Sequence, residues 1–314
     1  MKDLIFKETK PKRLDLYISE KYPLIRQSYV GKYLRQNKIK VNGTKAAANQ
    51  RLVSGDVISV YLNDNMILQP NKDNSFLFAA SQVDILYEDS NLFIVNKPSG
   101  TSVNSDDWQV FDTLTNRIKH YYHQNNISEN IPKLCHRIDT GTSGIVVLAK
   151  NEKALEFMFD QFRDKKLKKK YICAVKNNNS VKDGIYKAFL TKNSQRGFVT
   201  VSDKPLNPTS QNIETGIKTL YNFDNYKLLD INLFTGRTHQ IRAHLAYMNM
   251  PILGDSKYGD NNLNRKLKLK YQLLCSYQLK FGFIEDECFK YLSYKEINCP
   301  MPWFAEKFNS KEFL

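Results

Sequence analysis

The stretch HRIDTGTSG, residues 136–144, gathers residues that can do chemistry directly before an apolar run. It combines the cation Arg137, the carboxylate of Asp139 and several hydroxyls. The residues IVVLA that follow predict a strand buried on both faces, so the loop lies at a sheet edge, where clefts form. Asp139 is therefore either a turn residue that accepts backbone N–H bonds or a catalytic carboxylate beside a substrate.

A second stretch, FTGRTHQIRAHL, carries two arginines, Arg237 and Arg242. Thr238 is a candidate N-cap for a helix that starts near His239, which would put Arg242 in the first turn. A helix start with an arginine suits a phosphate or a carboxylate, although an ordinary basic helix face is the alternative. The histidines lack the glutamate that a zinc-binding helix requires, and no metal site is expected.

A third stretch, LKKKYICAV, places lysines before Tyr171, which opens an otherwise apolar strand. The lysines are either a solvated surface or phosphate contacts. Tyr171 is either a core aromatic, since tyrosine is favoured in strands, or a group that faces a substrate.

The elements around these stretches predict an α+β fold. Helical periodicity covers residues 111–122 and 151–167, and strands are expected near residues 83–98, 144–150, 168–175 and 224–234. These elements interleave without strict βαβ order, which favours a mixed sheet over a doubly wound one. The glycine patterns of nucleotide-cofactor sites do not occur in the sequence.

The composition indicates a polyanion as partner. Lysine and arginine total 47 against 32 acids, a net charge of +15, which favours nucleic acid over the alternative of an anionic membrane surface. No apolar run is long enough to span a bilayer, so we expect a soluble, cytoplasmic protein. The five scattered cysteines predict neither a disulfide framework nor a zinc site.

Residues 10–62 are expected to form a separate basic module, followed by a polar linker at 63–82 and a larger domain at 83–314. The module holds eleven lysines and arginines and three acids, a net charge of +8. It resembles an S4 RNA-binding domain in its opening Arg-Leu-Asp, basic second helix, Val-Asn-Gly turn and closing Gly-Asp strand. The resemblance implies that Arg26, Lys32, Arg35 and Lys38 lie on or near the helix that meets RNA.

The larger domain resembles the RluA-type pseudouridine synthases. The matching segments are LYEDSNLFIVNKPSGTSVN, HRIDTGTSG, KKKYICAV and TGRTHQIRAHLAYMNMPILGDSKYG, in that order. Together with an S4 module, they look most like the large-subunit ribosomal RNA members of the C type. The resemblance implies a mixed, largely antiparallel sheet with flanking helices, RNA as substrate, and no cofactor. Thr140-Gly141 departs from the family's common pattern.

The resemblance also implies roles for single residues. Asp139 would be the nucleophile, Arg242 the cation that keeps it ionised, and Tyr171 a group that stacks on the base or moves a proton. Arg137 would fill the space that a flipped-out uridine leaves. His136 would shape the loop, and two further cations, Lys97 and Arg237, would contact phosphates.

Several alternatives stay open at this level. The substrate is expected to be 23S ribosomal RNA, with transfer RNA as the alternative, and the protein is expected to act as a monomer. A non-catalytic RNA-binding factor for ribosome assembly is the rival of another class. The sequence also leaves open whether Asp139 attacks the base or the sugar.

Overall fold

The computed structural model describes residues 2–63, 66–68, 70–107, 109–193, 197–223 and 225–310. The chain divides into two compact units, one formed by Met1–Ala80 with Asp106–Phe111 and the other by Ser81–Ser105 with Asp112–Leu314. Within the described ranges, no helix is both long and apolar enough to cross a membrane.

The first unit packs two helices on a small sheet. Strands β1 (Lys2–Ile5), β5 (Val57–Val60) and β3 (Ile39–Val41) form the sheet in that order, and β2 (Lys12–Arg13) pairs with β4 (Arg51–Leu52). Helices α1 (Leu14–Lys21) and α2 (Gln27–Arg35) bury their apolar residues in a shared core with the sheet. The expected Asn42-Gly43 turn is present, with φ of +49° and +74°, and β3 pairs antiparallel with β5.

The stretch expected to be a linker contributes to this core. Ile67 is fully buried among the apolar residues of the first unit, and Ser75–Phe78 forms a 3₁₀ helix, η2. The residues that stabilise the first unit therefore extend beyond residue 62.

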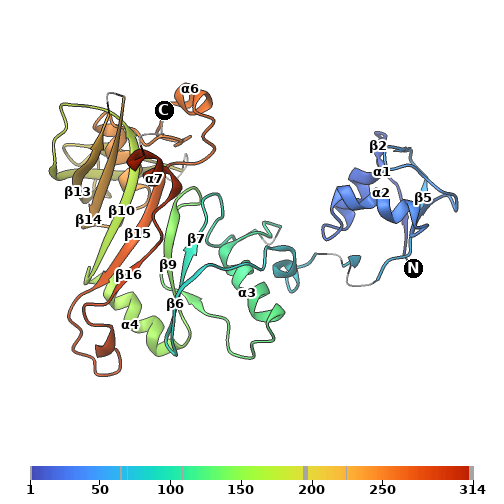
Figure 1. Ribbon diagram of the computed structural model, residues 1–314, viewed down its shortest axis with the longest axis horizontal. Coiled ribbons are helices and arrows are strands. Elements are labelled where there is room, and N and C mark those ends of the chain that lie inside the picture. The colour runs from blue at the N-terminus through green and yellow to red at the C-terminus, as the bar shows by residue number, and fades with distance from the viewer. Residues whose placement is uncertain are drawn as a thin grey trace. The chain divides into compact units, whose positions relative to one another are not determined.

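The second unit is built on one eleven-stranded sheet (Figure 1). Its main path runs β12-β11-β13-β14-β10-β15-β9-β7-β6, with β16 paired to β15 and β8 paired to β9. The bounds are β6 Ile85–Glu88, β7 Leu92–Lys97, β8 Lys133–Leu134, β9 Ser143–Ala149, β10 Leu167–Lys176, β11 Gly184–Asn193, β12 Phe198–Ser202, β13 Gln211–Asn222, β14 Tyr226–Leu233, β15 Leu274–Phe281 and β16 Glu296–Asn298. The pairings are antiparallel except between β9 and β15, so the expected mixed, largely antiparallel sheet is confirmed.

Helices flank this sheet. They are α3 (Leu114–Gln124), α4 (Glu152–Arg163), α5 (Gln240–Tyr247), α6 (Asn261–Lys266) and α7 (Trp303–Asn309), with the 3₁₀ helix η3 at Lys290–Leu292. Thr113 and Asn151 cap α3 and α4 through their side chains. Helix α5 differs from expectation, because its N-cap is His239 in the left-handed region (φ +55°) and not Thr238. Arg242 still lies in the first turn.

The parallel contact between β9 and β15 requires a glycine. Gly144 has a φ of +107°, and a Cβ there would lie 2.2 Å from the carbonyl oxygen of Ser276. A side chain would force the two strands apart, so only glycine permits this approach. The loop that carries Asp139 ends at this junction and is therefore anchored to the centre of the sheet.

Candidate active site

A cleft of about 820 Å³ brings the three stretches singled out in the sequence together. Its walls come from the 136–142 loop, β10, the start of α5 and residues 270–274. Several of the lining side chains are basic: Arg137, Lys169, Arg237, Arg242, Lys257 and Lys270. Asp139 is the only acidic residue among the described residues that line it. One carboxylate in a basic cleft suits chemistry on a polyanion.

Arg242 connects Asp139 to a second, fully buried carboxylate. Its Nη1 donates to Oδ2 of Asp139 at 2.7 Å. Its Nε and Nη2 donate to the two carboxylate oxygens of Asp255 at 2.7 and 2.9 Å. Asp255 is fully buried, whereas the Asp139 side chain is 26% exposed and opens onto the cleft. The bidentate pair fixes the guanidinium plane, and the remaining N–H group aims at Asp139.

The charges in this chain of contacts stabilise one another. Burial disfavours the charge on Arg242, but hydrogen bonds and charges from Asp255 and Asp139 outweigh it and raise the pKa of Arg242. Burial alone would raise the pKa of Asp255, yet its bonds to Arg242 and to the backbone N–H groups of Lys257 and Tyr258 lower it. Arg242 is thus a permanent cation beside Asp139.

An aromatic ring and a histidine complete the surroundings of Arg242. The Tyr258 ring centroid lies 5.3 Å from the guanidinium carbon, a cation–π contact. The Tyr258 hydroxyl lies 2.9 Å from Nδ1 of His239, whose Nε2 is 3.9 Å from Asp139. Burial, with the charge of Arg242, lowers the pKa of His239 despite the opposing charge of Asp139. His239 is therefore a neutral imidazole at pH 7.

Tyr171 lies on β10 and is 8% exposed in the cleft wall. Burial raises the pKa of its hydroxyl to about 12, with a smaller contribution from the charge of Asp139. The residue is a neutral phenol at pH 7, so its ring offers a packing surface and its hydroxyl a proton donor. These properties favour contact with a base over proton abstraction by a phenolate.

Lys97 requires a correction to its expected role. Its side chain is fully buried, and Nζ donates to the carbonyl oxygens of Pro98, Thr101 and Thr140 at 3.0, 2.7 and 3.1 Å. Burial lowers the pKa of Lys97 to about 7. A side chain with this burial cannot reach a phosphate of bound RNA. Lys97 instead supports the loop that carries Asp139.

Two more side chains hold the same loop. The Ser99 hydroxyl donates to the carbonyl of Gly141 at 2.6 Å, and Nε2 of Gln272 donates to the Thr142 hydroxyl at 3.1 Å. Gly141 is one of the two residues at which the sequence departs from the common pattern. A Cβ at residue 141 would lie 2.1 Å from Oε1 of Gln272, so glycine leaves room for this amide.

His136 shapes the start of the loop. Its Nε2 accepts the backbone N–H of Val147 at 3.0 Å, and its ring packs on Phe162 at 4.5 Å. Burial, assisted by the charge of Lys169, lowers the pKa of His136 to about 3. The ring is therefore neutral, as an accepting Nε2 requires.

The remaining predicted RNA contacts are exposed. Arg137 and Arg237 line the cleft with exposed side chains. In the first unit, the exposed bases are Arg26 at the N-cap of α2, Lys32 and Arg35 on that helix, and Lys38 after it.

Three residues of the site were missed in the sequence: Asp255, Tyr258 and Gln272. Asp255 and Tyr258 lie in the segment GDSKYG, which belongs to a matching stretch, although no role was given to either. An acid and an aromatic within one matching segment were the available signal. Gln272 lies in the stretch YQLL beside two leucines, and no sequence signal distinguishes it.

Comparison with known proteins identifies the family. The family model for RNA pseudouridylate synthase matches residues 91–247, which include Asp139, Tyr171 and Arg242. An uncharacterized RNA pseudouridine synthase of Mycoplasma genitalium is 34% identical over 316 aligned residues, covering 96% of this chain and 97% of the relative. The chain belongs to the RluA family of RNA pseudouridine synthases.

Relatives of this synthase include proteins with more specific names. Ribosomal large subunit pseudouridine synthase D of Borreliella burgdorferi is 31% identical, with 90% of this chain and 85% of the relative covered. Ribosomal large subunit pseudouridine synthase C of Vibrio parahaemolyticus is 31% identical, with 94% and 91% covered. The solved structure of human RNA pseudouridylate synthase domain containing 4 shares the fold of the synthase, with a TM-score of 0.58 at 23% identity over 73% of this chain and 92% of that one.

Proposed function

We propose that this synthase modifies uridines of 23S ribosomal RNA with Asp139 as nucleophile. Two relatives that align with 90% and 94% of the chain carry large-subunit names, which supports the ribosomal target. The observation that carries the catalytic assignment is the cleft itself. Its single acid among the described lining residues is bonded at 2.7 Å to an arginine that a buried aspartate orients.

The proposed reaction is an isomerisation. The bond from the sugar C1′ to N1 of uracil breaks, and a bond from C1′ to C5 forms. The proton on C5 is lost and N1 gains a proton, so no electrons are transferred. A carboxylate nucleophile divides this rearrangement into easier steps. Arg242 holds the Asp139 carboxylate in place through its hydrogen bond, and the Tyr171 ring faces the base as it turns.

The target uridine must leave the RNA stack to reach Asp139. Extrusion costs a few kcal/mol of stacking and pairing energy. Arg137 is exposed in the cleft and two residues from Asp139, so its guanidinium can occupy the vacated space. Arg237 then contacts the phosphates that flank the flipped nucleotide.

The first unit supplies further RNA affinity in this proposal. We assign residues 10–62 as an S4-like RNA-binding domain, in a unit whose core extends to Ile67. Exposed cations on and around α2 support the assignment, because phosphate contacts dominate such binding.

The test is pseudouridine mapping in ribosomal and transfer RNA from cells with and without the gene. We expect one or more 23S positions to disappear on deletion. The wild-type gene and a Glu285→Gln control, which changes an exposed residue outside the cleft lining, should restore them, and Asp139→Asn should not. Loss confined to transfer RNA would overturn the ribosomal target. Restoration by Asp139→Asn would overturn the assignment of Asp139 as nucleophile. If deletion removed no pseudouridine from either RNA, a non-catalytic factor for ribosome assembly would be favoured.

A further inference from the structure

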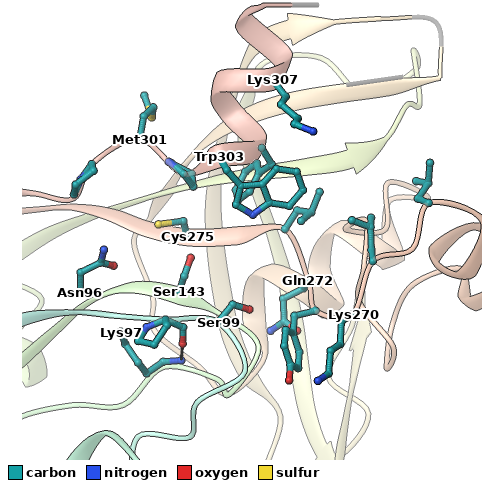
Figure 2. A pocket seen from close by; sticks show the side chains of 18 of the residues that line it. Asn96, Lys97, Ser99, Ser143, Lys270, Gln272, Cys275, Met301, Trp303 and Lys307 are labelled. Atoms are coloured by element: carbon teal, nitrogen blue, oxygen red, sulfur yellow. Dashed lines mark hydrogen bonds between the residues drawn. The ribbon is translucent and has the colours of Figure 1, made fainter. Parts of the chain in front are cut away.

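A second cavity adjoins the active-site cleft. It has a volume of about 660 Å³, and Lys270, Tyr271 and Gln272 line both cavities. Figure 2 shows Trp303 and Lys307 on one side of it, and Asn96, Lys97 and Ser99 on the opposite side. We call the open part of this cavity the Trp303 groove; it is lined by Lys268, Lys270, Tyr271, Met301, Trp303 and Lys307.

The Trp303 groove combines exposed aromatic surface with positive charge. Trp303 is 51% exposed and Met301 48% exposed, although both side chains are large and apolar. Lys307 Nζ lies 5.6 Å from the Trp303 ring centroid, and Lys270 Nζ lies 5.2 Å from that of Tyr271. None of the described residues that line the whole cavity is acidic.

This chemistry fits a nucleotide in a single strand. An exposed indole offers a face on which any base can stack, and adjacent lysines neutralise the flanking phosphates. The charge argues against an apolar protein segment, which would gain nothing from three exposed lysines. Continuity with the active-site cleft through residues 270–272 supplies the second argument, because RNA bound in the cleft can extend across this shared wall into the groove.

We propose that the Trp303 groove binds an unpaired nucleotide of the RNA substrate, with the base stacked on Trp303 and the two flanking phosphates beside Lys268 and Lys307. The inference rests on RNA being the substrate, and it adds a site to that function beside the cleft that holds Asp139, with residues 270–272 as the shared wall. Trp303 and Lys307 belong to α7, which contributes none of the contacts described above for the 136–142 loop. The groove therefore contributes to RNA binding and not to the chemical step.

Tryptophan fluorescence tests the stacking directly, because the chain has only two tryptophans, Trp108 and Trp303. In full-length Trp108→Phe protein, all tryptophan emission comes from Trp303. Titration with unmodified 23S transcript, and with a twelve-nucleotide oligouridylate, should quench this emission to saturation. Absence of quenching while RNA binds by filter retention overturns the proposal. Quenching by the mononucleotide UMP without any by either RNA also overturns it, because the groove would then hold a small metabolite.

Kinetic variants provide the second measurement. Trp303→Ala should raise KM for 23S transcript about tenfold, the loss expected for one stacked base, with kcat unchanged. Lys268→Gln with Lys307→Gln should lower the slope of log affinity against log salt by about 1.4, the value for two single-strand phosphate contacts. Two controls are matched to these: Phe159→Ala, whose side chain is 48% exposed and lines neither cavity, and Lys182→Gln with Lys187→Gln. Variants that behave like these controls overturn the proposal.

The outcomes separate this proposal from the proposed function. If wild-type protein forms no pseudouridine in 23S RNA while RNA quenches Trp303, the ribosomal target fails and the groove assignment stands. The groove assignment fails alone under a different set of results. Wild-type protein is then active and Asp139→Asn is not, while RNA leaves Trp303 emission unchanged and Trp303→Ala leaves KM unchanged.

Discussion

Asp255 holds Arg242 through two parallel hydrogen bonds, from Nε at 2.7 Å and from Nη2 at 2.9 Å. Asp255 is fully buried and Arg242 nearly so. A buried pair of this geometry is expensive to break, since one charge then remains without its partner. The pair leaves one guanidinium edge for the cleft, and that edge meets Asp139. Asp255 thus positions Arg242, the proposed catalytic cation, without lining the cleft itself.

The first prediction concerns Asp255→Asn. An amide cannot accept both guanidinium bonds, so Arg242 loses its fixed plane. We expect kcat to fall about 100-fold, the effect of a misplaced catalytic group. We expect the free energy of unfolding to fall by about 3 kcal/mol. Release of tritium from RNA labelled at C5 of uridine measures kcat, and urea titration measures stability.

The control for this variant is Glu296→Gln, which breaks an ion pair with Lys280. Both side chains of this ion pair are more than one-third exposed, so solvent screens the pair. Little change in kcat or in stability is therefore expected. Equal behaviour of the two variants would contradict a positioning role for Asp255.

The sequence was sufficient to predict three residues that the cleft brings together, but not the residues that support them. Asp139, Tyr171 and Arg242 are separated by up to 103 positions, yet each lies in a distinctive motif, and the structure brings them into one cleft. Lys97 shows what the sequence could not predict. Its side chain is buried because the backbone at residues 98–101 and at residue 140 folds around it. Gln272 could not be predicted either, because only its contact with Thr142 distinguishes it from other polar residues. Sequence motifs identify which side chains can do chemistry. The burial of a residue and the register of a strand depend instead on pairing with segments far away in the sequence.

The second prediction concerns pH and His136. Its folded-state pKa of about 3 lies below the unfolded value of 6.5. Between these values the unfolded chain binds the proton, so stability is lost as pH falls through this window. At pH 5 the loss from this residue is about 2 kcal/mol. His136→Gln retains an acceptor for the Val147 N–H group but does not titrate.

Urea titrations at pH 7.5 and pH 5 test this. The wild-type protein should lose about 2 kcal/mol more than His136→Gln over this interval. His244, whose pKa burial lowers to about 4, titrates in both proteins and cancels in the comparison. Equal losses in the two proteins would show that His136 is not held neutral by the fold.

The third prediction concerns the pair Gly141 and Gln272. In Gly141→Ala the new Cβ would displace the Gln272 amide, which would then lose its bond to Thr142. Because Asp139 lies two residues away in the same loop, we expect kcat to fall about tenfold, roughly 1.4 kcal/mol of lost transition-state stabilisation. Adding Gln272→Ala removes the clash, so the double variant should be no slower than Gln272→Ala alone. Strictly additive losses in the tritium-release assay would exclude this contact as the cause.

The fourth prediction concerns the basic helix of the first unit. Lys32 and Arg35 are exposed on α2, and the S4 assignment places them against phosphates. Lys32→Gln with Arg35→Gln should weaken RNA affinity and lower its salt slope by about 1.8, the value for two contacts to a duplex. At saturating RNA kcat should be unchanged, because neither side chain belongs to the catalytic cleft. Lys7→Gln with Lys10→Gln removes the same charge from exposed positions of the same unit outside α2. If this control lowers the slope equally, the effect reflects net charge, and α2 has no special role in meeting RNA.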